Sequence, residues 1–210
     1  MTFGSPSKHI LIFAVPLLIG NLFQQLYNMV DSLIVGNFVG ANALASVGTC
    51  GSVSFLFFSL SSGLALGIGI IVAQYFGAKN EEKVRHTIGN SFYVLIAASL
   101  VVSLIGIFFS PFIMTLLQCP DIIRKDAITY LRTSCYGIVF IAQYNGVAAI
   151  LRALGDSKTP LYFLILSSIV NVVLDLVFVL CFDWAVFGVA FATVVSQAVS
   201  AIASLIYAFK

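Results

Sequence analysis

Apolar residues dominate this chain in six long runs, which short polar or charged breaks separate. Each run reaches about 20 residues, enough for an α-helix to cross a hydrocarbon core of about 30 Å. The runs are too continuous for the alternating pattern of an outer-membrane β-barrel. The pattern therefore predicts an all-α integral membrane fold. It is a six-helix transmembrane bundle over residues 1–210, with spans at 9–38, 44–76, 84–109, 127–151, 159–182 and 185–209.

Prolines and uncharged turns set the expected ends of several spans. Pro111 weakens any continuation of the third span, because proline lacks an N–H and clashes inside a helix. Thr159 followed by Pro160 is typical of an N-cap and a first helical position, so the fifth span is expected to begin there. Pro16 lies inside the first span and predicts a kink, and the uncharged residues 36–42 predict a short turn.

Composition narrows the class of protein. Hydrophobic residues make up 60% of the chain and charged residues 9%, whereas a soluble domain carries about 25% charged residues. The lipid bilayer is therefore one partner, and no cluster of basic and aromatic residues indicates nucleic-acid binding. The four cysteines lack a spacing typical of metal sites, so no bound cofactor is expected.

Basic residues are distributed unevenly between the two sets of predicted span ends. One set carries Lys8, Lys79, Lys83, Arg85, Arg152, Lys158 and Lys210, and the other carries Arg124, Lys125 and Arg132. Cytoplasmic loops are enriched in Lys and Arg, so the set of seven is expected in the cytoplasm. An even number of spans then places both termini on the cytoplasmic side.

Two acidic residues, Asp31 and Asp175, lie inside hydrophobic spans, whereas the other six lie in or beside polar breaks. A charged side chain at the centre of a bilayer costs about 3 kcal/mol or more. Such residues are expected to face the bundle interior and form an ion or proton site. Counted from the predicted outer span ends at about 1.5 Å per residue, Asp31 and Asp175 lie about 10 Å deep and Thr193 about 12 Å.

Other polar side chains share helix faces with these two acids. Asn171 precedes Asp175 by four residues, and Gln24 and Tyr27 precede Asp31 by seven and four. Carboxylate, amide and hydroxyl oxygens are hard ligands that suit a small cation such as sodium, or a proton that two carboxylates share, but not zinc. Simpler interpretations remain for single residues: water access for Asp31, interhelical hydrogen bonding for Asn171 and packing for Thr193.

Five stretches of the chain resemble the multidrug and toxic compound extrusion (MATE) family of secondary transporters. They are PLLIGNLFQQLYNMVD at 16–31, VGNFVGANALA at 35–45, GLALG at 63–67 with AQYFGAK at 73–79, LRALGDSKTP at 151–160 and NVVLD at 171–175. The chain is most similar to the prokaryotic branch named for DNA-damage-inducible protein F. The resemblance implies a cation site, with sodium as a possible ion, at Asp31, Asn171, Asp175 and Thr193. It also implies a supporting network of Tyr27, Tyr130 and Asn145, beside Gln24, and a hinge at Pro16.

The resemblance also implies a function. Members of the family have twelve helices in two lobes, so this chain is expected to be the N-terminal lobe. Its partners would be a small organic substrate and a C-terminal six-helix lobe or a second copy. The whole would be a multidrug efflux antiporter in the plasma membrane of a prokaryote. It would export amphiphilic, often cationic, molecules in exchange for protons or sodium ions.

Three other functions are weighed against this one. A flippase for lipid-linked precursors needs a basic lining for pyrophosphate, whereas all ten basic residues lie in loops or at span ends. An intramembrane aspartyl protease expects Gly-x-Gly-Asp, but Asp31 lies in NMVDSL and Asp175 in VVLDLV, so no enzyme activity is expected. A purely structural membrane module would tolerate replacement of both acids.

The charge distribution leads to a test of topology. In a chain without its native cysteines, a cysteine at position 80 should resist an impermeant thiol reagent added outside intact cells. A cysteine at position 183 should react, because it lies in a loop on the side with few basic residues. Reversed labelling would overturn both the orientation and the depths counted from it.

Overall fold

The computed structural model describes residues 6–208, with side chains from residue 14 onward. Phe209, at the predicted end of the last span, and Lys210 lie outside the described residues, as do residues 1–5. The described chain is helical, with no strand. Its elements are α1 Pro6–Ile34, η1 Val35–Val39, α2 Ala41–Gly77, α3 Glu81–Leu116, α4 Asp121–Ala153, α5 Thr159–Leu176, η2 Val177–Cys181 and α6 Ala185–Ala208.

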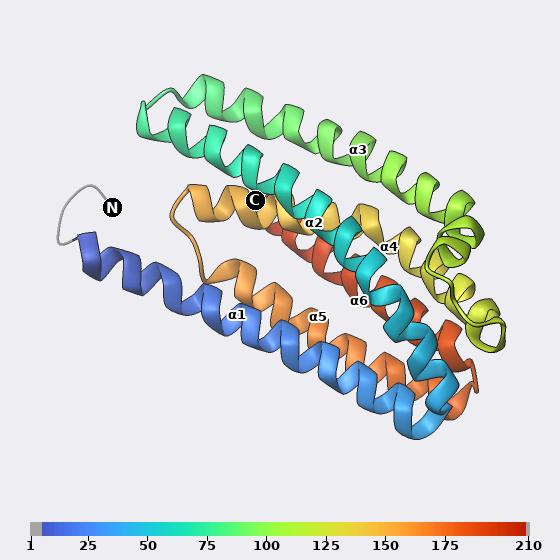
Figure 1. The fold of residues 1–210 in the computed structure, drawn as a ribbon. Coiled ribbons are helices and arrows are strands. Elements are labelled where there is room, and N and C mark those ends of the chain that lie inside the picture. The colour runs from blue at the N-terminus through green and yellow to red at the C-terminus, as the bar shows by residue number, and fades with distance from the viewer. Residues whose placement is uncertain (1–5, 209–210) are drawn as a thin grey trace.

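Helix α4 is the centre of the bundle. It packs against α2, α3 and α6, and α5 packs on α6. Helix α1 lies alongside α5 at one edge of the bundle, with α3 at the opposite edge (Figure 1). Because α1 rests mainly on α5, its position depends on the contacts between these two helices.

Five of the helices, α2 to α6, are long and apolar enough to cross a membrane. Helix α1 is long enough but is amphipathic. Its apolar face carries the exposed Leu18, Leu22 and Leu26, while Gln24 and Asp31 lie on the face that lines an internal cavity. The sixth span, at α1, remains a prediction.

Two helix ends differ from the expected spans. Helix α3 continues through Pro111 to Leu116, and α4 begins at Asp121 directly after Pro120. Proline removes one helical hydrogen bond to the carbonyl four residues earlier, which here is Ile107. That carbonyl accepts from Ser110 Oγ at 3.0 Å and from Nε of Arg132 at 3.3 Å. The helix tolerates Pro111 because these side chains replace the missing donor.

The expected turn at 36–42 is also different. The chain stays helical as the π-turn η1 and ends only at Gly40, whose φ of 118° favours glycine. A second π-turn, η2, follows α5. Each π-turn begins within a few residues of an intramembrane acid, and Val35 and Val179 pack into one buried cluster. π-turns occur often at functional sites, and this pair joins the C-terminal ends of the two acid-bearing helices.

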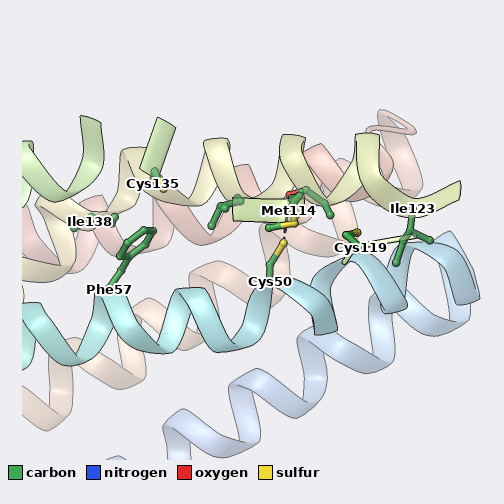
Figure 2. Close-up of a cluster of buried hydrophobic side chains, with 9 residues drawn as sticks. Cys50, Phe57, Met114, Cys119, Ile123, Cys135 and Ile138 are labelled. Carbon is green, nitrogen blue, oxygen red and sulfur yellow. Dashed lines mark hydrogen bonds between the residues drawn. The ribbon is translucent and has the colours of Figure 1, made fainter. Parts of the chain in front are cut away.

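Small side chains let α2 and α3 approach α4 closely. Figure 2 shows Phe57 of α2 directed toward Cys135 and Ile138 of α4, while Cys50 of α2 lies close to Met114 of α3 farther along the same cluster. Side-chain hydroxyl and thiol groups of α3 and α2 donate hydrogen bonds to backbone carbonyls of α4. Ser103 Oγ donates to Cys135 O at 2.7 Å and Cys50 Sγ to Ala127 O at 3.3 Å. Close packing with polar bridges is the usual means of helix association in lipid.

The close approach of α3 and α4 at Gly106 can be tested by substitution. A Cβ at Gly106 would collide with Cys135 Sγ and lie 3.0 Å from the Phe57 ring. We expect Gly106→Ala to lower stability by about 1–3 kcal/mol, measured as thermal unfolding of the purified protein in detergent. Gly89→Ala on the same helix is the control, because no atom lies within 4 Å of its added Cβ. An equal effect of both changes would contradict the packing.

Candidate cation-binding site

The four residues expected to bind a cation lie together where α1, α5 and α6 meet. The amide of Asn171 is oriented with its nitrogen toward the two carboxylates, because the opposite orientation would place its oxygen against acceptors only. In this orientation the nitrogen donates to Asp31 Oδ1 at 3.1 Å and to Asp175 Oδ2 at 3.2 Å. The other end of the amide lies 3.4 Å from Thr193 Oγ1. A single asparagine thus joins both acids to α6.

Burial differs across the site. Asn171 and Asp175 have 0% exposed surface, whereas Asp31 is half-buried and lines the cavity. Asp175 Oδ1 is buried and has no hydrogen-bond partner within the described part of the chain. Buried polar atoms are nearly always paired, and the Asp31 carboxyl lies within hydrogen-bonding range of Asp175. A proton or cation between the two carboxyls would therefore satisfy this oxygen.

Two tyrosines of the expected supporting network lie beside the acids. Tyr27 lies within hydrogen-bonding range of Thr193, and both Tyr27 and Tyr130 are close enough to interact electrostatically with Asp31 and Asp175. Tyr130 also packs against the buried cluster that contains Val35 and Val179 of the two π-turns, here called the valine cluster. The tyrosines therefore connect the carboxylates to α4 and to the helix ends.

The other expected residues lie farther along the cavity. Gln24 and Pro16 line it on α1. Asn145 donates to Ser62 Oγ of α2 at 3.3 Å. It lies about 22 Å from Tyr130 along α4, counted at the rise of an α-helix. Asn145 does not contact either acid, so its place in the network remains a prediction.

The cavity has a volume of about 950 Å³ and is bounded by α1, α2, α4, α5 and α6. Many of its lining residues carry hydroxyl or amide groups. Among the described residues that line it, only Asp31 and Arg152 are charged. Arg152 lies at a helix end, as the sequence predicts, but its side chain also lines the cavity. The sequence does not reveal this, because a basic residue at a span end is expected to face solvent. The argument against a basic lining is therefore weaker at this position.

The site can hold a positive charge. Two carboxylates that share one N–H in a low-dielectric site repel each other unless a proton or cation lies between them. The available ligands are carboxylate, amide and hydroxyl oxygens, which suit a hard cation or a proton. No third acid, histidine or cysteine joins them in the described residues, so the geometry does not resemble a transition-metal site.

Known proteins are similar to this chain over most of its length. The family MatE matches residues 16–177. Probable multidrug resistance protein YpnP of Bacillus subtilis is 33% identical over 210 residues, which covers 100% of this chain and 47% of YpnP. A crystal structure of MATE in the bent conformation superposes with a TM-score of 0.91 at 27% identity, covering 98% of this chain and 46% of the other.

A second solved structure agrees. A MOP superfamily transporter from Pyrococcus furiosus superposes with a TM-score of 0.92 at 27% identity, covering 98% of this chain and 45% of the transporter. The chain therefore spans about half the length of the relatives that it matches.

The shared hydrogen bonds of Asn171 lead to a test of the site. Asn171→Leu removes the side-chain nitrogen that bridges the two carboxylates in the described structure, so we expect a stability loss of about 1–3 kcal/mol at neutral pH. Acid or a high sodium concentration should restore part of it, because either would neutralise the repulsion. The measurement is thermal unfolding of the purified chain across pH and sodium concentration.

Asn145→Leu is the matched control, because it removes an interhelical amide bond away from the acids. Its loss of stability should not depend on sodium. A loss for Asn171→Leu that is equally insensitive to pH and sodium would contradict charge repulsion at the site.

Proposed function

Because this chain belongs to the MatE family, we propose that it forms the N-terminal lobe of a proton- or sodium-coupled antiporter. The antiporter exports amphiphilic, often cationic, molecules across a prokaryotic plasma membrane, and both termini of this lobe lie in the cytoplasm. The carboxylate pair Asp31 and Asp175, joined through Asn171 beside the cavity, is the observation that supports the proposal most strongly.

Coupling follows from the different charge of the occupied and empty site. A bound proton or sodium ion neutralises one of the two carboxylate charges, removes their mutual repulsion and holds α1 against α5. When the site is empty, Asn171 alone moderates the repulsion. Since α1 packs mainly on α5, this difference acts directly on the position of α1. A ligand shifts a conformational equilibrium only by its differential affinity for the two states, and here the carboxylate pair supplies it.

The ion determines the orientation of the asparagine. With a proton, one carboxylic acid donates to the other carboxylate, and the Asn171 nitrogen can keep both bonds. With sodium, the amide turns over, so that its oxygen joins the carboxylates and Thr193 as a ligand. Pro16 lies on the cavity face of α1, inside the helix. Its missing hydrogen bond makes it the point at which α1 bends between the two states.

Export of a substrate needs a second lobe. Alternating access in secondary transporters comes from two repeats that rock about a shared site. The cavity of this lobe supplies one wall of that path, and a C-terminal six-helix lobe or a second copy supplies the other.

The test uses the lobe together with a six-helix C-terminal partner in liposomes. Asp31→Asn and Asp175→Asn should each abolish accumulation of a fluorescent cationic substrate driven by a proton or sodium gradient. The amide keeps the volume of the carboxylate but cannot exchange a cation. Protein insertion should be unchanged, because a neutral side chain is easier to place in lipid.

Asp121→Asn is the control, because Asp121 is exposed in the first turn of α4. Gradient-driven accumulation at the wild-type rate in either Asp31→Asn or Asp175→Asn would refute the coupling role of the pair.

A further inference from the structure

The cavity carries opposite charges toward its two ends. Asp31 lies beside Tyr130 of α4, whereas Arg152 lies in the last turn of α4. At helical rise this separation is about 33 Å. Among the described lining residues these are the only charged side chains. Because they are far apart, a group bound at Arg152 would not touch the carboxylate of Asp31.

Arg152 has no acidic partner in the described structure. The two ion pairs found there join His86 to Glu82 and Arg124 to Asp121. Arg152 is half-buried, and guanidinium groups in such places are normally paired with carboxylates or phosphates. An unpaired guanidinium on a cavity wall is therefore available to pair with an anion.

Asp156, the nearest acid along the chain, is engaged elsewhere. Its Oδ1 accepts from the backbone N–H groups of Lys158 and Thr159, both at 3.0 Å, so Asp156 rather than Thr159 caps α5. Partial burial alone would raise the pKa of Asp156, but hydrogen bonds from Thr159 and Lys158 outweigh it and lower the pKa. The carboxylate is thus ionised and committed to the end of α5.

The surroundings of Arg152 suit an amphiphile with an anionic group. Tyr144 and the buried Ser157 line the same end of the cavity. Tyr144 holds its own ring in place by donating to Pro160 O at 2.9 Å. Farther in, Leu161 and Leu164 of α5 provide an apolar wall. A planar guanidinium with five N–H donors matches carboxylate and phosphate oxygens in a bidentate manner.

We propose that the Arg152 end of the cavity binds the carboxylate or phosphate group of an amphiphile, whose apolar part lies along the α5 wall. This inference rests on the proposed function in one respect: if the chain is part of an exporter, molecules with an anionic headgroup belong to its cargo. The binding itself needs neither an ion gradient nor the second lobe. Lipids of the inner leaflet and soluble amphiphiles both carry such groups.

The experiment measures equilibrium binding to the purified 210-residue chain in nanodiscs of phosphatidylcholine. The probe is dansyl-aminoundecanoic acid, and its methyl ester is the neutral reference. The acid should bind at least about tenfold more tightly than the ester, as expected for one charge-assisted hydrogen-bonded pair. Arg152→Gln should abolish this preference while leaving binding of the ester unchanged, which also shows that the variant is folded. Arg152→Lys should keep part of the preference.

Lys158→Gln is the matched control, because Lys158 is exposed in the same loop and does not line the cavity. Equal binding of acid and ester, or an equal loss in Arg152→Gln and Lys158→Gln, would overturn the proposal. Phosphatidylglycerol and decyl phosphate are then compared as competitors of the probe. If phosphatidylglycerol competes at lower concentrations, a lipid is the source of the anion. If decyl phosphate does, the source is a soluble amphiphile. These binding results do not depend on the transport test: the preference for the acid can be present even if the Asp31 and Asp175 variants show that the pair has no coupling role.

Discussion

Two carboxylates held against one amide nitrogen, within helices that lie in lipid, constrain much of this structure. Asp31 and Asp175 come from helices that are far apart in sequence, so α1 and α5 must pack side by side. Helix α1 then presents polar residues such as Gln24 and Asp31 to the cavity, while Leu18, Leu22 and Leu26 are exposed on its other side. The π-turns that follow each acid join both helix ends in one buried valine cluster. The acids therefore constrain the end of the bundle at which α1 and α5 terminate.

Much of this arrangement could be predicted because lipid leaves few choices. Every backbone group in the hydrocarbon must be paired within a helix or a closed barrel, so long apolar runs were enough to predict six helices. Depth counting predicted that Asp31, Asp175 and Thr193 would meet, because a regular rise converts residue number into position. The spacing of Asn171 and Asp175 predicted a common face, and the structure joins them by a hydrogen bond.

Features that depend on distant partners could not be predicted in this way. Helix α3 passes Pro111 only because Arg132 of another helix and Ser110 satisfy the free carbonyl of Ile107. The π-turn η1 replaces an expected loop, since Val35 is held in a buried cluster with residues of α2, η2 and α6. Arg152 lies at a span end that the sequence predicts to be solvated, and only the packed bundle reveals that its side chain lines the cavity.

The most direct measurement is infrared difference spectroscopy of the purified chain while the proton or sodium concentration is stepped. If the buried pair holds the exchangeable cation, the step produces a carboxyl difference signal that Asp175→Asn removes, because Asp175 carries the unpaired buried oxygen. Asp121→Asn should leave that signal intact. A carboxyl signal that persists unchanged in both Asp31→Asn and Asp175→Asn would contradict a cation site at this pair.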